Sequence, residues 1–355
     1  MVSPDGVGDD LARKTKALQA RHCWWSSHND RLSSRKAVIN LAIPSEWFLE
    51  RSAIASAEEL DRRTASGELA LALQIPPDFG RSVRRGEATE IAALIDGTDT
   101  NRAGTVESYV EGAHSHVLAT GAQSALALTG LGASARPDLA PPAQLAPRFH
   151  YNPAMESLPA IGPSIPPLLL LLFPAILMAV SVAREKEIGT ITNFYVTPTG
   201  RAEFLIGKQL VYVAITLLNF VILTVLVVTV LGVPLKGSPA ALVIGALVYA
   251  FAATGYGLLV SMMTSTQVTA VFAAAILSVM PTLQFSGMIT PVSSLEGPAR
   301  ILGTFWPTTW YMGLSVGTFT KGLGLSDLSG HLLRLAAFGP VLTAFAIILL
   351  KKQEK

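Results

Sequence analysis

Long uncharged apolar segments fill the chain from about residue 160 onward. The hydrocarbon core of a bilayer is about 30 Å thick and an α-helix rises 1.5 Å per residue, so a span needs about 20 apolar residues. Segments that satisfy this requirement are 161–183, 209–231, two within 237–295 separated by the polar turn 264–267, and 332–350. The succession predicts an α-helical polytopic membrane protein with about five spans, because a large soluble core would need more polar surface.

The connection between the fourth and fifth predicted spans is more apolar than an ordinary loop. We expect short helices that dip into the outer leaflet, with aromatic side chains as interfacial anchors. A plain loop with scattered aromatic residues is the alternative. The turn-forming, capping and aromatic residues of this region are Pro281, Gly287, Pro291, Glu296, Trp306, Pro307, Trp310 and Tyr311.

The first 160 residues show the hydrophobic periodicities of short strands and helices. Residues 69–75 alternate as in a half-buried strand, 91–95 read as a second strand, and 106–117 carry one apolar helical face. Residues 78–80 open a short basic helix between the strands. An Ala/Pro-rich linker follows at 134–147, and 148–151 is expected to be a last strand before the first span. We therefore predict a small extracytoplasmic α/β domain with its linker at 51–150, a membrane domain at 151–355, and a poorly defined segment at 1–50.

Composition supports this division. Hydrophobic residues make up 50% of the 355 residues and charged residues only 15%, and the mean hydropathy is +0.45. Soluble domains contain nearer one quarter charged residues. The formal net charge of +2 is too small to indicate nucleic-acid binding. Cys23 is the only cysteine, which excludes an intramolecular disulfide and a cysteine-based zinc cluster.

Lysine and arginine predict the orientation, because they are enriched in cytoplasmic loops. An odd number of spans puts the loop after the first span and the C-terminal tail on one side. Those two regions hold Arg184, Lys186, Arg201, Lys208, Lys351, Lys352 and Lys355, against Lys236, Arg300 and Lys321 opposite. The first set is therefore expected in the cytoplasm. Arg334 lies about one turn inside the last predicted span and is expected to snorkel to the headgroups.

Few residues offer catalytic or metal-binding chemistry. Asp96 and Asp99 fit a turn and a helix cap better than a catalytic pair, and His114 and His116 fit a solvated pair better than a metal site. The predicted spans contain no His, Asp or Glu. This argues against two alternative functions, an intramembrane enzyme and an ion-coupled secondary transporter, since both usually require ionisable groups at depth.

A charged cluster lies at the inner end of the first span, formed by Arg184, Glu185, Lys186 and Glu187. Ile188, Ile191 and Tyr195 then follow at helical spacing, until 197–200 break the helix. The pattern predicts a short amphipathic helix along the membrane surface, which is either interfacial padding or a docking surface for a cytoplasmic partner.

The residues of this cluster carry a family resemblance. The motif 182–191, together with 196–198, 201–205 and 207–209, resembles the membrane subunit of type-2 ABC exporters. The run 284–297 is similar to the permease half of the ribosome-associated ATPase and related multidrug-type permeases. The resemblance implies a half-transporter of six helices. It also implies ATPase coupling through Arg184, Glu185, Lys186, Glu187, Gly189, Thr190 and Pro198, and an outer gate formed by Pro281, Gly287, Pro291, Glu296 and Pro307.

The nucleotide site is expected on another chain. A phosphate-binding loop needs Gly-x-x-x-x-Gly-Lys-Ser/Thr, whereas Ala202 precedes Gly207-Lys208 at the first glycine position and Gln209 replaces the hydroxyl residue. The chain is thus expected to be non-catalytic and to hold no cofactor, with ATP and Mg²⁺ on a partner ABC ATPase. Further expected partners are the lipid bilayer, a second permease copy and a periplasmic adaptor protein. The expected location is the bacterial inner membrane, and the uncharged pathway favours hydrophobic or amphipathic cargo.

The start of the chain departs from the resembled pattern, which has a helix before the extracytoplasmic domain. The best apolar run, 37–48, is too short for a span and is interrupted by Pro44 and Glu46. We therefore expect a reading frame that is truncated or shifted near its start, with a sixth helix upstream of about Ser52 in the native protein. The alternative is that 161–183 acts as a reverse anchor.

Overall fold

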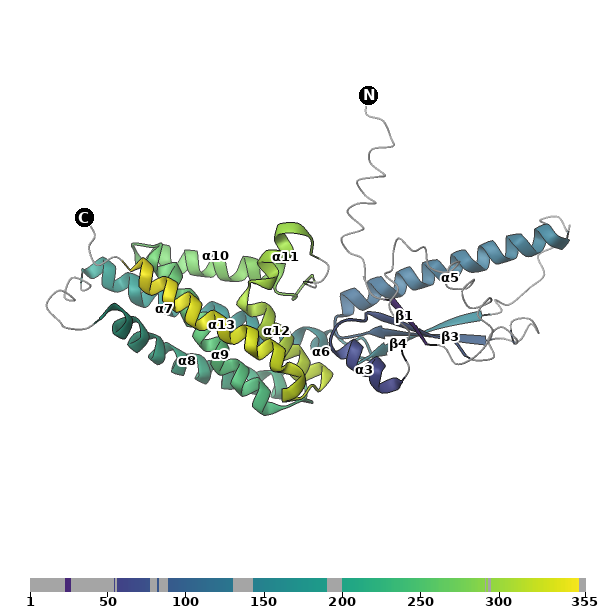
Figure 1. Ribbon diagram of the computed structural model, residues 1–355, viewed down its shortest axis with the longest axis horizontal. Coiled ribbons are helices and arrows are strands. Elements are labelled where there is room, and N and C mark those ends of the chain that lie inside the picture. The colour runs from purple at the N-terminus through teal and green to yellow at the C-terminus, as the bar shows by residue number, and fades with distance from the viewer. Residues whose placement is uncertain are drawn as a thin grey trace, which may run out of the picture. The chain divides into compact units, whose positions relative to one another are not determined.

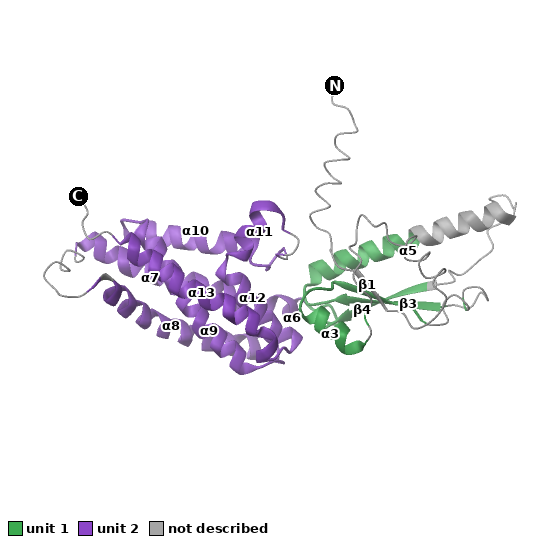
Figure 2. Cartoon of the chain, viewed as in Figure 1, with its two compact units in different colours: residues 1–156 green, residues 157–355 purple. Residues whose placement is uncertain are grey.

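A computed structural model describes residues 23–26, 54, 56–76, 82, 89–129, 143–189, 200–290, 292 and 295–350. The chain forms two compact units, Met1–Glu156 and Ser157–Lys355 (Figure 2). The boundary lies six residues after the predicted one at 150/151. Each unit is described by itself.

The first unit contains a four-stranded sheet in the order β1-β2-β3-β4. The sheet is drawn in Figure 1, with β1, β3 and β4 labelled. Its strands are β1 (Cys23–Ser26), β2 (Leu71–Gln74), β3 (Thr89–Asp96) and β4 (Ala143–His150). The β1/β2 and β3/β4 pairs are parallel, and the β2/β3 pair is antiparallel. Strand β1 comes from the segment 1–50, where we expected no defined element.

Helices cover both faces of this sheet. Helix α5 (Thr100–Thr129) packs Ala103, Val106 and Val110 against Leu71 and Ile95. On the opposite face, Leu60 of α3 (Ala57–Ala65) packs with Leu69, Ala72 and Ile54. Because both faces of the sheet are covered, Ala70 and Ala72 are as buried as Leu69 and Leu71.

The linker prediction is wrong at its end. Residues 143–147 belong to β4, which pairs with β3 from Thr89↔Ala143 to Asp96↔His150. Strand β4 lies at the sheet edge. Pro147, which has no backbone N–H to donate to a neighbouring strand, is tolerated there. Helix α3 was missed, although Ser56 and Glu59 form a readable start signal: the Ser56 hydroxyl accepts the Glu59 N–H at 3.2 Å. The predicted basic helix at 78–80 lies outside the described residues.

The second unit confirms the polytopic helical fold. In the part of the chain that the structure describes, five helices are long and apolar enough to cross a membrane. They are α7 (Ile165–Ile188), which follows α6 (Ser157–Ile161) and η1 (Gly162–Ser164), α8 (Arg201–Thr229), α9 (Pro239–Met262), α10 (Gln267–Phe285) and α13 (Leu325–Leu349). The turn between α9 and α10 falls where Thr264–Gln267 predicted it, with Thr266 accepting the Thr269 N–H as N-cap.

Three predicted spans have wrong bounds. Helix α7 continues through the charged cluster to Ile188, α8 begins eight residues before Gln209, and α13 begins seven residues before Leu332. The hydrophobic pattern marks only the part of a helix that lies in the hydrocarbon core. The backbone hydrogen bonds continue beyond that part, so the helix extends into the headgroup region. As a consequence, the longer helices include Glu185, Glu187, Glu203, Asp327 and His331 near their ends, outside the bounds predicted for the spans.

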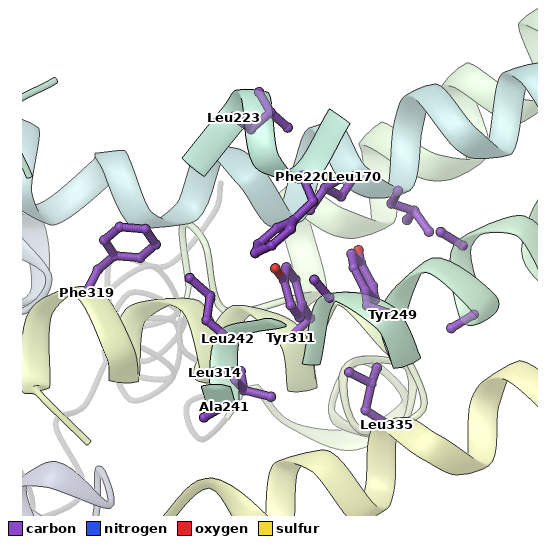
Figure 3. Packing of buried hydrophobic residues seen from close by; sticks show 14 of the residues in the cluster. Leu170, Phe220, Leu223, Ala241, Leu242, Tyr249, Tyr311, Leu314, Phe319 and Leu335 are labelled. Carbon is purple, nitrogen blue, oxygen red and sulfur yellow. The ribbon is translucent and has the colours of Figure 1, made fainter. Parts of the chain in front are cut away.

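Helix α9 is the centre of the bundle, because 67% of an apolar 18-residue stretch of α9 is buried, against 22% of the corresponding stretches of α10 and α13. Small residues permit the close crossings: a Cβ on Gly257 would lie 2.6 Å from the Ala175 oxygen of α7, and one on Gly255 would lie 3.0 Å from Thr343 of α13. Figure 3 shows Tyr249 of α9 beside Tyr311 of α12 (Pro307–Val316) in the core, with ring centroids 4.4 Å apart.

Candidate functional site

The charged end of α7, which we define as Arg184, Glu185, Lys186 and Glu187, joins the ends of three other spans. The Glu185 carboxylate lies 2.6 Å from the Lys208 ammonium of α8. Lys208 also donates to the backbone oxygen and the hydroxyl of Ser181, at 3.1 and 3.0 Å. The start of α8 is thereby held against the last turns of α7.

Lys186 and Glu187 face two different helices. The Lys186 ammonium donates to the Ser261 carbonyl at 2.6 Å and to the Thr264 carbonyl at 3.3 Å, at the C-terminal end of α9. The Glu187 carboxylate accepts the Gln267 backbone N–H at 3.0 Å and its amide N–H at 3.1 Å, at the first residue of α10. A cation at a helix C-terminus and an anion at an N-terminus both match the helix dipoles.

Arg184 and Ile188 face outward at this end, as does the exposed Glu187. Both are exposed, Ile188 by 60%, and among the described residues Arg184 has no ion-pair partner. Gly189 ends α7 with a φ of +79°, a left-handed conformation that favours glycine. Thr190, Pro198 and the predicted amphipathic helix lie outside the described residues. The charged end therefore presents one exposed face and uses its other side chains to tie four helices together.

A buried polar contact continues from this end into the bundle. Gln209 of α8 is 2% exposed. Its amide donates to the Phe251 carbonyl at 3.0 Å and to the Thr254 hydroxyl at 3.2 Å in α9, and its oxygen accepts the Thr343 hydroxyl of α13 at 3.1 Å. The nitrogen and the oxygen of the Gln209 side chain both form hydrogen bonds to other helices. These bonds hold α8, α9 and α13 together.

A pocket of about 330 Å³ adjoins Gln209, between α8, α9 and α13. Its lining is mostly apolar and includes Ile206, Phe251 and Pro340. Pro340 has no N–H, so the carbonyl of Ala336, which also lines the pocket, lacks its usual intrahelical donor. The pocket has largely apolar walls, with Gln209 and Thr343 as its polar lining residues.

The connection between α10 and α13 contains two short helices, α11 (Gly297–Thr304) and α12, as predicted. Tyr311, expected to be an interfacial anchor, is instead fully buried beside Tyr249. The Trp306 indole donates to the Thr282 hydroxyl at 3.0 Å, one turn before the end of α10. The Tyr249 hydroxyl, near the middle of α9, bonds to Thr308 at 2.8 Å and to the Pro167 carbonyl at 2.9 Å. Because Thr308 is fully buried beside these helices, α12 lies within the bundle.

The predicted gate residues lie within or at the ends of the helices of this region. Pro281 lies inside α10, and Gly287 follows the helix with a φ of +91°. Glu296 precedes α11 at its N-cap position, and Pro307 is the first residue of α12. Pro291 lies outside the described residues. The residues therefore bracket the two short helices, while the contacts themselves come from Thr282, Trp306 and Thr308.

The first unit offers no comparable site among its described residues. The Asp96 carboxylate accepts the Thr98 N–H at 3.1 Å, and Asp99 accepts the Asn101 and Arg102 N–H groups at 3.0 and 3.2 Å. Both therefore stabilise a turn and a helix start, as expected. Burial raises the pKa of Tyr151 to about 12, with smaller contributions from Asp96 and Asp61, so its phenol stays neutral. No group of three potential metal ligands occurs in the described part of the chain.

Sequence reasoning identified the charged end but missed its partners. Lys208 was used only for the orientation, the family motif and the missing phosphate-binding loop, Gln209 only for the last two, and Gln267 only as part of a turn. A signal was nevertheless present, because a Lys-Gln pair directly before an apolar segment is costly in a membrane unless both side chains find partners.

Comparisons with known proteins agree with this architecture. The family described as "ABC-2 family transporter protein" matches residues 36–348. The probable multidrug ABC transporter permease YbhS of Escherichia coli (strain K12) is 26% identical over 266 residues, covering 75% of this chain and 68% of the relative. The inner membrane transport permease YhhJ of the same organism is 25% identical over 312 residues, covering 86% and 79%. The family match spans most of the chain and includes all five candidate spans, so this protein belongs to the ABC-2 transporter family and is a permease subunit of an ABC exporter.

Proposed function

We propose that a separate ATPase subunit, which binds ATP and Mg²⁺, drives this permease through the charged end of α7. The observation that carries the proposal is the set of contacts from Glu185 to α8, from Lys186 to α9 and from Glu187 to α10. A force applied to one exposed helix end would therefore move four helix ends together.

The same helices carry this displacement to the opposite end of the bundle. Helix α9 reaches α12 through the Tyr249–Thr308 hydrogen bond, and α10 reaches α12 through Thr282 and Trp306. Helices are stiff along their axes. A shift of α9 relative to α10 therefore changes the position of α12, which is hydrogen-bonded to both. Closure of the ATPase would in this way open the outer connection.

Orientation and assembly follow the same proposal. The charged end lies in the cytoplasm, and the connection through α11 and α12 lies on the outer side of a bacterial inner membrane. Two permease copies form the transporter, because the chain resembles a half-transporter. A periplasmic adaptor is a further candidate partner of the first unit.

The proposed cargo is hydrophobic or amphipathic. The pocket beside Gln209 supports this class, because its walls are largely apolar.

Purification of the affinity-tagged chain from its native membranes in a mild detergent tests the proposal. We expect a second polypeptide that contains a phosphate-binding loop and gives the complex Mg²⁺-dependent ATP hydrolysis. The same preparation stripped of its partner should hydrolyse no ATP. Cargo export by the stripped chain alone, driven by an ion gradient, would contradict the proposal.

A further inference from the structure

Arg334 is a charged residue within the last span. The apolar part of α13 ends at Leu350, and Lys351 and Lys352 follow directly. Measured from there, about 20 residues of helix cross the hydrocarbon core, which places its other boundary near Gly330. Arg334 therefore lies about one turn below that boundary, within reach of the phosphate level of the leaflet.

The surroundings hold the guanidinium group in place. Its central carbon lies 4.5 Å from the centre of the Trp310 ring of α12. The Trp310 indole is fixed because it donates to the Thr304 carbonyl at 3.0 Å. His331 contacts the edge of the same ring, with centroids 5.7 Å apart, and fits only because Gly313 has no Cβ. Stacking on a fixed indole leaves the guanidinium edge free to donate hydrogen bonds.

The described residues supply no anion for this edge. Arg334 is exposed, and among them no carboxylate lies within ion-pair distance of it. Asp327, two turns earlier on the same helix, accepts the Gly324 N–H at 3.1 Å and belongs to the start of α13. An exposed, uncompensated charge below the boundary of the hydrocarbon core is costly, so an external anion is favoured there.

The helix surface below Arg334 shows what kind of molecule carries that anion. Val341, Phe345 and Ile348 follow at spacings of 7, 11 and 14 residues, which puts them on the same helical stripe. These three side chains are 49%, 56% and 74% exposed. The stripe thus offers a cation at the phosphate level and an apolar track beneath it.

We propose that Arg334, stacked on Trp310, binds the phosphate of a phospholipid whose acyl chain lies along Val341 and Phe345. The guanidinium donates two parallel hydrogen bonds to the phosphate oxygens, a geometry that arginine provides and lysine does not. The lipid headgroup then lies beside Trp310 of α12, so a defined lipid is part of the outer connection. Only the choice of leaflet rests on the proposed orientation.

The test measures the melting temperature of the purified chain in detergent with three additives. Phosphatidylglycerol should raise the Tm by about 4 °C, whereas a diacylglycerol with the same acyl chains and inorganic phosphate should each raise it far less. Arg334→Gln should lose most of the increment. Arg300→Gln, which removes an exposed charge from α11, should keep it. If Arg334→Gln does not fold, Arg334→Lys replaces it and should show a reduced increment.

Three results would overturn the proposal. An equal increment in Arg334→Gln would show that phosphatidylglycerol acts elsewhere, and an equal increment with inorganic phosphate would show a free-anion site. No increment in a wild-type chain that is dimeric in detergent, together with a monomeric Arg334→Gln, would assign this stripe to the second copy. Because no ATPase is needed, the outcome is independent of the coupling proposal.

Discussion

The Glu185 carboxylate and the Lys208 ammonium lie 2.6 Å apart and join the end of α7 to the start of α8. Both side chains are largely shielded, with exposed fractions of 29% and 19%. The ion pair is therefore screened less by salt than a surface pair. It links two helices whose ends, Ile188 and Arg201, are separated by twelve residues in the sequence.

We predict that Glu185→Ala lowers export and cargo-stimulated ATPase activity by about tenfold while the protein remains in the membrane, because α8 no longer follows α7. A double-mutant cycle with Lys208→Ala measures the pair itself. The double variant should lose little more than either single variant. Additive losses would show that the two residues act separately.

Lys186→Ala should also uncouple transport, because it removes the hydrogen bonds to the Ser261 and Thr264 carbonyls that tie α9 to α7. The expected loss is again about tenfold in export, with normal amounts of protein in the membrane. Lys236→Ala, at the opposite end of the bundle, is the matched control and should export normally. Normal export by Lys186→Ala would show that the charged end only sets the membrane orientation and does not couple the helices.

The crossing of α7 and α9 predicts a sharp difference between two glycines. A Cβ on Gly257 would lie 2.6 Å from the Ala175 oxygen and 2.9 Å from the Met178 Cβ, whereas one on Gly207 would meet no atom within 4 Å. Gly257→Ala should lower the free energy of unfolding by about 1–3 kcal/mol. Gly207→Ala should be neutral or raise it by up to about 1 kcal/mol, because alanine favours the helix. Thermal unfolding in detergent measures both, and equal effects would show that the helices do not cross this closely.

Topology is tested by labelling single cysteines in a Cys23→Ser background. A cysteine at Gly189 should resist a membrane-impermeant thiol reagent in intact cells, whereas one at Arg300 in α11 should react. Permeabilised cells provide the control for reactivity. Labelling at Gly189 in intact cells would invert the orientation.

The sequence predicted the number and rough place of the spans, because apolar length is a direct consequence of bilayer thickness. It placed the turn at Thr266 correctly, since a Thr cap after an apolar run is a local signal. It could not predict that Lys186 bonds to α9 or that Gln209 joins three helices, because these contacts depend on which helices become neighbours. Strand β1 was missed for the same reason: four residues become a strand only when β2 lies beside them.

Crosslinking from Ile188 tests the central claim most directly, that a separate ATPase acts on the end of α7. A photoreactive phenylalanine analogue would replace Ile188, which is 60% exposed, and in a second variant Val230, which is 73% exposed at the other end of α8. After illumination in native membranes, mass spectrometry identifies the crosslinked protein. We predict a crosslink from position 188 to a polypeptide with a phosphate-binding loop, and none from position 230. The absence of such a polypeptide at position 188, or its equal capture at position 230, would contradict the account.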